Sequence, residues 1–272
     1  IGEINRQTNE LARELGVIGL MNVQFAVKDG DIYVLEVNPR ASRTVPFVAK
    51  ATGLPIAKVA ARVIAGDNLD KALGCYAVRS KSRHIAVKES VFPFARFPGA
   101  DIILGPEMKS TGEVMGLDER FPRAFAKSQL ASGTIIPESG TVFISVKNDD
   151  KAAMVALGLQ LVQLGFELFA TRGTAEELTR AGVVTNVVKK VREGRPHIVD
   201  MMISGDIDLV FNTTEGAFAI ADSFTLRQTA LYYRIPYYTT VAGCRAMISA
   251  ISALKTGSLD VAPLQSYFKF SY

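Results

Sequence analysis

Three oxygen-bearing side chains flank one turn of the sequence and could together hold a metal ion. Gln24 lies before Asp29-Gly30, and Glu36 and Asn38 lie after it. Asp-Gly between two apolar runs is typical of a β-hairpin, which would bring the three side chains together. Magnesium and manganese prefer carboxylate and amide oxygens, completed by substrate phosphates. The spacing therefore predicts part of a Mg²⁺ or Mn²⁺ site.

The register of this hairpin decides whether the three side chains share a face. We expect strands over 21–27 and 32–37. A two-residue turn would place Gln24 opposite Leu35 and mix polar with apolar residues on both faces. A three-residue loop makes one face wholly apolar, through the pairs Val23–Val37, Phe25–Leu35 and Val27–Tyr33. Because a slip of one residue inverts the faces, we predict the three-residue loop, which gathers Asn22, Gln24, Glu36 and Asn38.

Two arginines follow the second strand. Arg40 and Arg43 could neutralise the charge that develops on a transferred phosphate. A solvated strand face followed by an Asn-Pro loop would give a similar pattern, and short motifs carry a risk of false positives. From these residues alone, the metal site and the solvated face are equally open.

The second half of the chain changes in character after the stretch 133–140, which contains Gly, Pro, Ser and Thr without periodicity. Five strand-like runs then alternate with helical runs. The strands are expected at 141–146, 167–170, 183–188, 209–212 and 237–239. This alternation indicates a parallel sheet covered by helices on both faces. We predict an α/β fold in two domains, 1–133 and 134–272.

Polar residues follow four of these strands, where α/β domains bind their ligands. Ser145 and Lys151 follow the first strand, 171–174 the second, Lys190 the third and 212–214 the fourth. Hydroxyl, amide and ammonium groups at one edge suit a phosphate or a carboxylate, and a helix beginning near 171–174 favours an anion. Each residue alone fits a helix cap or a solvated lysine equally well. Together they predict a ligand site.

Composition limits the possible classes of protein. The chain has 272 residues with a formal net charge of +4 and an isoelectric point near 9.0. It has no basic block typical of a nucleic-acid groove, no apolar run long enough for a bilayer and no signal peptide. Cys75 and Cys244 match no disulfide or metal spacing, so a reducing cytoplasm is expected. A helical pattern over 4–15 follows Ile1 almost directly, which we interpret as a fragment of a longer chain.

Longer strings carry a resemblance to a known family. Residues 22–25 read Asn-Val-Gln-Phe, and residues 34–47 read Val-Leu-Glu-Val-Asn-Pro-Arg-Ala-Ser-Arg-Thr-Val-Pro-Phe. Residues 105–116 read Gly-Pro-Glu-Met-Lys-Ser-Thr-Gly-Glu-Val-Met-Gly. These strings resemble the end of the ATP-grasp domain in the second, carbamoyl phosphate-forming half of the carbamoyl phosphate synthetase large subunit. The resemblance covers essentially the whole chain.

By this resemblance, Gln24, Glu36 and Asn38 hold the metals that bridge the nucleotide phosphates, and Arg40 and Arg43 contact phosphate or carbamate. The implied reaction is ATP-dependent phosphorylation of carbamate, made from bicarbonate and glutamine-derived ammonia for pyrimidine and arginine synthesis. Catalysis there is mostly positioning and charge neutralisation. A glutaminase small subunit is the expected partner, in a hetero-oligomer. Because the nucleotide-covering loop of an ATP-grasp unit is not in this chain, we expect the chain alone to be inactive.

The second half resembles the Rossmann-like, methylglyoxal-synthase-like allosteric domain that ends the same subunit and binds effectors such as UMP or IMP. The positions that match its effector pocket are Ser145, Lys151, Thr171, Thr174, Lys190, Asn212, Thr213, Thr214 and Asp222. The positions that match its ornithine site are Glu89, Tyr237 and Thr239. One departure is that Ala217-Phe218 stands in place of the usual arginine pair, after an added negative charge at Glu215. Arg172 could compensate, so the identity of the effector stays open.

Two other interpretations remain. The chain could be a regulatory binding module that keeps only a vestigial ATP-grasp piece. It could also be an enzyme like methylglyoxal synthase, although that chemistry needs Asp and His at strand ends that here carry Thr, Lys and Asn. His84 and His197 are assigned no role. The aromatic and proline cluster at 92–98 is expected to pack at a domain junction rather than to stack nucleic-acid bases.

Overall fold

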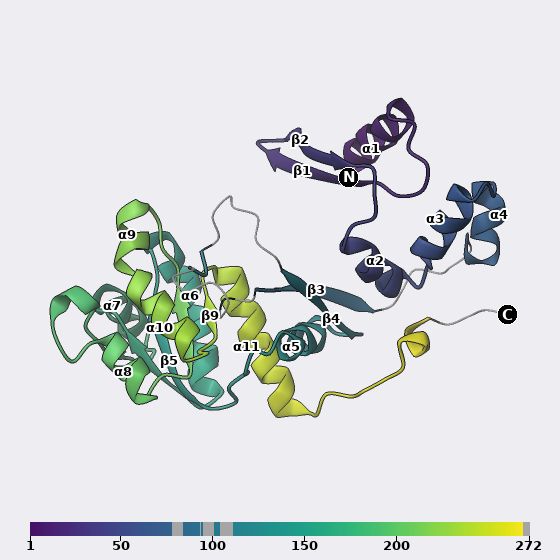
Figure 1. Ribbon diagram of the computed structural model, residues 1–272. Helices are drawn as coiled ribbons and strands as arrows, with labels where there is room; N and C mark the ends of the chain where they lie inside the picture. The colour runs from purple at the N-terminus through teal and green to yellow at the C-terminus, as the bar shows by residue number, and fades with distance from the viewer. Residues whose placement is uncertain (78–83, 93, 95–100, 104–110, 269–272) are drawn as a thin grey trace. The chain divides into compact units, whose positions relative to one another are not determined.

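The computed structural model describes residues 1–77, 84–92, 94, 101–103 and 111–268, and it falls into two compact units (Figure 1). The first unit comprises Ile1–His84 and Val261–Tyr272, and the second comprises Ile85–Asp260. The expected linker 133–140 lies inside the second unit, between a helix and a strand. Because compactness alone does not set the limits of a family's domain, the boundary at 133 stays a prediction.

The first unit contains one hairpin and several short helices. Its elements are α1 (Gly2–Glu14), β1 (Asn22–Lys28), β2 (Asp31–Asn38), α2 (Thr44–Thr52), α3 (Ile56–Ile64), α4 (Leu69–Leu73) and the 3₁₀ turns η1 (Gly74–Ala77) and η5 (Leu264–Tyr267). Among its described hydrophobic residues, the buried ones are Val59, Ala60 and Ala72. Leu35 on β2 is 64% exposed, so the hairpin gains little from burial.

The hairpin turns through a two-residue loop. Lys28 pairs with Asp31, and both loop residues have positive φ angles, 53° at Asp29 and 92° at Gly30. Two successive positive φ angles define a type I′ turn, whose twist matches that of the flanking strands and which favours Asp-Gly. The predicted three-residue loop is therefore wrong at this end of the hairpin.

A β-bulge at Leu35 restores the predicted register at the other end. Phe25 pairs with Val34 and Val27 pairs with Ile32, so the predicted pairs Phe25–Leu35 and Val27–Tyr33 are wrong. Beyond the bulge, Val23 pairs with Val37, as predicted, and Gln24 pairs with Glu36. The type I′ turn sets the register of the pairs next to it, such as Phe25 with Val34. The separation of polar from apolar faces needs a register shifted by one residue, in which Gln24 pairs with Glu36. One extra residue on β2 satisfies both requirements.

In the second unit, a small antiparallel sheet packs against a helix. β3 (Ile85–Val91) pairs with β4 (Gly112–Asp118), and α5 (Phe121–Ala131) packs against both strands. A Cβ atom at Gly116 would lie 1.9 Å from the carbonyl oxygen of Ala124. Glycine at position 116 therefore lets β4 approach α5 this closely.

Five parallel strands form the main sheet, as predicted, and they lie in the order β7-β6-β5-β8-β9. The strands are β5 (Gly140–Ser145), β6 (Phe166–Ala170), β7 (Asn186–Val187), β8 (Leu209–Asn212) and β9 (Tyr237–Tyr238). The chain runs outward from β5 through β6 to β7, and then returns to β8 on the other side of β5. The strand order thus reverses between β5 and β8, which is where open α/β sheets bind ligands.

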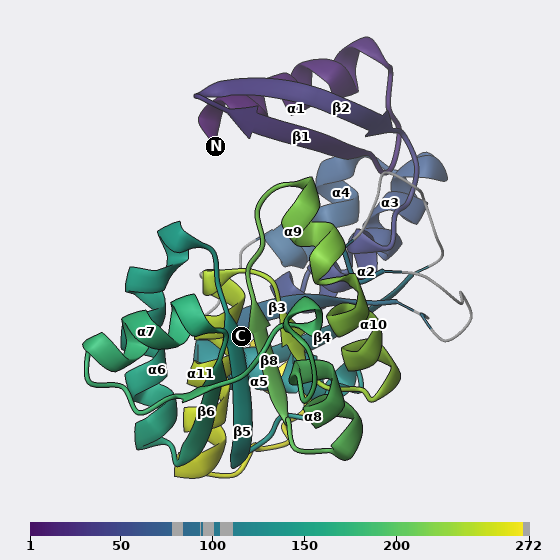
Figure 2. The ribbon, with the colours of Figure 1, turned by 90° about the vertical axis from the view of Figure 1, so that its left-hand side faces the viewer.

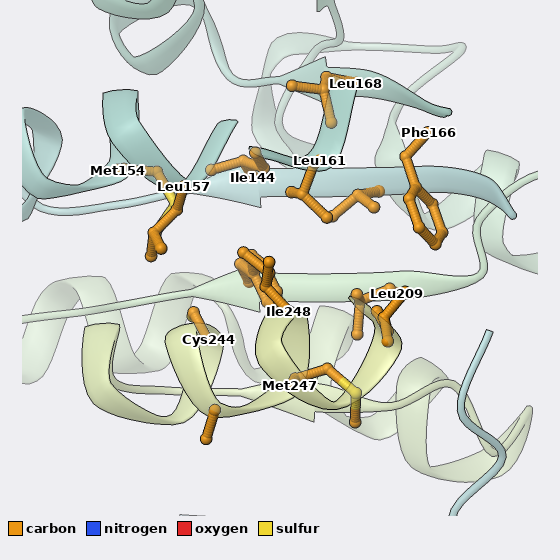
Figure 3. Packing of buried hydrophobic residues seen from close by; sticks show 14 of the residues in the cluster. Ile144, Met154, Leu157, Leu161, Phe166, Leu168, Leu209, Cys244, Met247 and Ile248 are labelled. Carbon is orange, nitrogen blue, oxygen red and sulfur yellow. The ribbon is translucent and has the colours of Figure 1, made fainter. Parts of the chain in front are cut away.

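Helices cover both faces of this sheet (Figure 2). On one face lie α6 (Lys151–Gln163), α7 (Arg172–Arg180) and α11 (Val241–Thr256), and on the other lie α8 (Ile198–Ser204) and α10 (Phe224–Tyr232). Ile144 and Leu209 pack with Met247 and Ile248 of α11 (Figure 3), whereas Phe143 packs into the opposite core. Side chains alternate across a strand, so neighbouring residues of β5 enter different cores.

Two strands are shorter than predicted: β7 covers two residues of the strand expected at 183–188, and β9 covers two residues of the one expected at 237–239. A short helix, α9 (Ala217–Asp222), precedes α10, and the two helices are separated at Ser223. Phe92 and Phe94 have ring centroids 5.4 Å apart. Pro93, Phe97, Pro98 and residues 105–110 of the 105–116 string lie outside the described residues. No helix in the described part of the chain is long and apolar enough to span a membrane.

Candidate functional site

The first candidate site lies at the open end of the hairpin. Gln24 stands directly opposite Glu36, and Asn22 stands opposite Asn38, so all four side chains lie on one face. The side-chain amide of Asn38 donates a hydrogen bond from Nδ2 to Oε1 of Glu36. Because Asn38 donates through its nitrogen, its amide oxygen and the second carboxylate oxygen of Glu36 can still accept a cation. The structure thus brings the three predicted metal ligands together.

The chemistry of these donors fits a hard cation that keeps other oxygen ligands. The set offers one carboxylate and two amides, which suits Mg²⁺ or Mn²⁺ when phosphates complete the coordination. Across the described residues, no cluster of three or more His, Cys, Asp or Glu side chains offers an alternative metal site. Arg40 and Arg43 are both exposed, and Arg40 donates to the carbonyl oxygen of Ala41 at 3.0 Å. Both arginines lie within five residues of Asn38 in sequence.

The second candidate site is a cavity of about 600 Å³ at the carboxyl ends of β5 and β8. Ser145 and Asn212, the last residues of these two strands, are register partners across the sheet. Seven of the nine predicted effector residues line the cavity, and they are Ser145, Thr171, Lys190, Asn212, Thr213, Thr214 and Asp222. Six of them come from four different strand ends, as the sequence predicted, and Asp222 ends the helix α9.

Hydroxyl groups join the strand ends at the base of the cavity. Thr171, which precedes α7, donates from Oγ1 to Ser145 Oγ at 3.2 Å. Thr213 Oγ1 accepts the backbone N–H of Lys147 at 3.2 Å. Thr174 is 2% exposed, and its Oγ1 accepts the N–H of Val146 at 3.3 Å. Thr174 therefore supports the loop after β5 and does not itself line the cavity.

Lys151 is the other predicted effector residue that does not line the cavity. It begins α6, and its Nζ reaches the first turn of α7, because a Cβ at Gly173 would lie 3.4 Å from it. The ammonium group therefore adds positive charge beside the N-terminus of α7, which itself favours anions. Arg172, the residue suggested to compensate for the missing arginine pair, is exposed in the same turn and is not part of the cavity lining.

Two cations in the cavity wall were not predicted from the sequence. Lys147 pairs with Glu215 at 3.2 Å, and Arg192 pairs with Asp222 at 2.7 Å. All four residues line the cavity. The negative charge that Glu215 adds is thus met by Lys147, whose pKa is raised, above all by this hydrogen bond. Their nearness to Ser145 and Lys190 in sequence is the signal that could have identified them.

The three residues matched to an ornithine site do not form one cluster. Tyr237 and Tyr238 face opposite cores of the sheet, and Glu89 lies near Tyr238. Gln129 connects this pair, because it hydrogen-bonds Glu89 and accepts the Tyr238 hydroxyl at 2.9 Å. Burial raises the pKa of Glu89, against the effect of that bond. Thr239 is exposed just after β9.

Two family models define the class of protein to which the hairpin and the cavity belong. "Carbamoyl-phosphate synthase L chain, ATP binding domain" matches residues 2–72, which contain the hairpin. "MGS-like domain" matches residues 153–239, which contain much of the cavity wall. A solved methylglyoxal synthase from Elizabethkingia anophelis NUHP1 aligns with a TM-score of 0.36 and 17% identity, over 42% of this chain and 80% of that one.

Curated relatives match nearly the whole chain. The carbamoyl phosphate synthase large chain of Mesorhizobium japonicum is 57% identical over 98% of this chain, and that of Myxococcus xanthus is 57% identical over 96%. The chain belongs to the carbamoyl phosphate synthase large-chain family and corresponds to the C-terminal part of these proteins. It spans only 23% and 24% of the two relatives' own lengths. The ATP-binding match supports the use of ATP.

Proposed function

We propose that the hairpin forms one wall of a site where ATP phosphorylates carbamate to carbamoyl phosphate. The observation that carries this proposal is the 57% identity to a carbamoyl phosphate synthase large chain over 98% of this chain. The geometry supports it, because Gln24 faces Glu36, and Asn38 hydrogen-bonds Glu36. Mg²⁺ or Mn²⁺ held by these three residues would neutralise charge on the nucleotide phosphates. Arg40 and Arg43 would contact phosphate or carbamate.

The remaining parts of this reaction come from outside the chain. A fragment spanning 23% of its relative contains one wall of the proposed site, and we expect no turnover from the fragment alone. We further propose that a glutaminase subunit supplies the ammonia from which carbamate is made. This partner follows from the family and not from a surface of this chain.

A chimera tests the catalytic proposal. Residues 1–272 would replace the matching segment of the Mesorhizobium japonicum large chain, and carbamoyl phosphate formation would be measured with ammonia as the nitrogen source. Glu36→Gln removes the one carboxylate of the metal set, so kcat should fall by about 10²- to 10³-fold. Glu14→Gln, at an exposed position of α1, is the matched control and should leave kcat unchanged. Full activity in the Glu36→Gln chimera would contradict the proposal.

For the second unit, we propose that the cavity binds an anionic effector such as UMP or IMP. Hydroxyls from three strand ends and the ammonium of Lys190 surround a volume of about 600 Å³, which fits a nucleotide-sized ligand. The N-terminus of α7 lies at its edge and favours a phosphate. Ornithine is a separate effector proposal, and it has less support because Glu89 and Tyr237 face different parts of the unit.

Calorimetric titration of the chain with UMP, IMP and ornithine tests the effector proposal. Lys190→Ala should weaken nucleotide binding at least about tenfold, since it removes a charge-assisted contact. Lys189→Ala is the matched control, because the neighbouring lysine is not part of the cavity lining. If all three titrations are heatless at millimolar ligand, the chain has no such effector site.

A further inference from the structure

A fully buried arginine lies next to the cavity. Arg227, on α10, is 1% exposed. Its Nε and Nη2 donate to the two carboxylate oxygens of Asp101, both at 2.6 Å, and its Nη1 donates to Ser223 Oγ at 2.6 Å. A buried guanidinium is costly unless it is paired and hydrogen-bonded. The position of Arg227 therefore depends on Asp101 and Ser223.

Two side chains of the cavity wall are connected to this arginine. Ser223 lines the cavity and accepts the third bond of the guanidinium. Asn212 also lines the cavity, and its Nδ2 donates to the hydroxyl of Tyr237. Arg227 interacts with that same hydroxyl. Two routes thus lead from the cavity to Arg227, one through Ser223 and one through Tyr237.

Asp101 carries the connection away from the parallel sheet. It lies between β3 and β4, and it is 126 positions from Arg227 in sequence. Its Oδ1 also accepts the backbone N–H of Ile103 at 3.1 Å. The same carboxylate therefore fixes the backbone at 101–103 and compensates the buried charge beside the cavity. Because these groups are hydrogen-bonded in series, a change at the cavity alters the electrostatic environment of residues 101–103, and a change at 101–103 alters that of the cavity.

We propose that Arg227 is a positioning residue: it holds Asn212 and Ser223 in place and links occupancy of the cavity to the backbone at 101–103. Placing these side chains is a property of the free chain. The link to occupancy rests on the proposed function of the cavity as an effector site. Because coupling between two positions is reciprocal, each end can be perturbed and the other observed.

The test in the free chain uses NMR signals at the two ends. Asp101→Asn should shift the side-chain amide of Asn212 and the backbone amide of Ser223. Asp118→Asn is the matched control, because Asp118 is also a carboxylate paired with cations, but its partners are Lys127 and Arg123 rather than Arg227. It should leave both signals unchanged. Changes confined to 101–103, or equal changes in both variants, would overturn the proposal.

A milder variant keeps the test decisive if Asp101→Asn does not fold. Ser223→Ala removes only the hydroxyl at the cavity and should shift the backbone amide of Ile103. Ser249→Ala is its control, because that hydroxyl bonds within α11 to the carbonyl of Arg245. An Ile103 signal unmoved by Ser223→Ala would contradict the positioning role.

A ligand titration separates the link from the effector proposal itself. UMP, IMP and inorganic phosphate would each be added, with calorimetry reporting binding and the Ile103 amide reporting the link. A ligand that binds should move the Ile103 signal, and Tyr237→Phe should reduce that shift at least about twofold. Binding without a shift at Ile103 refutes the link. Absence of binding by all three refutes the effector function, while the two free-chain tests still decide the positioning role.

Discussion

Glu36 and Asn38 stand on an exposed two-stranded hairpin, whereas Asn212 ends a strand whose Leu209, Val210 and Phe211 are all 0% exposed. The hairpin obtains its arrangement from local features, a type I′ turn and a bulge. The cavity obtains its arrangement from a packed sheet with a core on each face. The difference teaches that the cavity has its walls within one compact unit, while the polar side chains of the hairpin stand on an exposed element with little buried support.

The largest expected difference between the two regions is in stability. Leu209→Ala removes a fully buried side chain and should lower the free energy of unfolding by about 2–5 kcal/mol. Leu35→Ala makes the same change at a 64% exposed position and should cost less than about 0.5 kcal/mol. Urea denaturation followed by hydrogen exchange would assign each effect to its unit, because two units need not unfold in one step. Equal losses of unfolding free energy in Leu209→Ala and Leu35→Ala would contradict the proposed difference between the two regions.

A second prediction concerns how the stability of the second unit depends on acidic pH. Burial raises the pKa of Asp118, but the hydrogen bonds from Lys127 and the backbone of Arg120, with the nearby charges, outweigh it and leave this pKa below its usual value. The folded state therefore binds the proton less tightly than the unfolded state does. The stability that Asp118 contributes is complete above its unfolded pKa and is lost as the pH falls through the lowered folded value.

Replacement of Asp118 tests this sign. Asp118→Asn should cost about 1–3 kcal/mol at neutral pH and make the stability of the second unit less dependent on acid. Asp260→Asn is the control, because Asp260 pairs with Arg123 at 2.7 Å but is 80% exposed, and it should cost under about 1 kcal/mol. Thermal unfolding of both variants from pH 2 to pH 7 gives the comparison. If Asp118→Asn loses as much stability at low pH as the wild type does, other carboxylates determine the acid sensitivity.

A third prediction concerns the affinity of the cavity for a nucleotide. Glu215 holds Lys147, a cation that a phosphate could otherwise engage. Glu215→Gln should therefore tighten nucleotide binding by about two- to fivefold, because an exposed ion pair contributes only about 0.2–1 kcal/mol. Glu177→Gln breaks a comparable pair with Arg180 outside the cavity lining and should change nothing. Calorimetry at low and high salt measures both, and weaker binding by Glu215→Gln would reverse the assigned role.

The smallest expected effect on stability lies at the hairpin. Asn38→Ala removes the hydrogen bond to Glu36 and should change the free energy of unfolding by less than about 0.5 kcal/mol. In the chimera, the same change should lower activity by about 10- to 100-fold, since it disturbs a proposed metal ligand. Chemical denaturation and steady-state kinetics would show the two effects apart. A loss of stability that matches the loss of activity would indicate a structural role instead.

The sequence predicted most accurately those features that depend on local or periodic signals. Asp29-Gly30 marks the turn, and the alternation of strands with helices predicts the parallel sheet and the convergence of residues such as Ser145 and Asn212. The bulge was missed because each register explained one end of the hairpin, and the pattern does not show that both occur. β4 was missed because Gly112 and Gly116 interrupt its apolar run, although close approach to α5 is the reason for Gly116.

The parts of the cavity that escaped prediction depend on contacts between distant segments. Lys147 and Arg192 lie in the stretches that follow β5 and β7, where sequence does not determine the direction of a side chain. Asp101 and Arg227 are far apart in sequence, and neither stands in a recognisable motif. A charged residue on α10 predicts a solvated position, and only its pairing allows Arg227 to be fully buried.

The bulge at Leu35 has a consequence for how the hairpin can vary among relatives. Pairing on the turn side of Leu35 follows one register, and pairing on the side of Gln24 and Glu36 follows another. A residue gained or lost near Asp29-Gly30 can be absorbed at the bulge before it reaches the polar pairs. The turn can therefore change in length or composition without changing the alignment of Gln24 with Glu36.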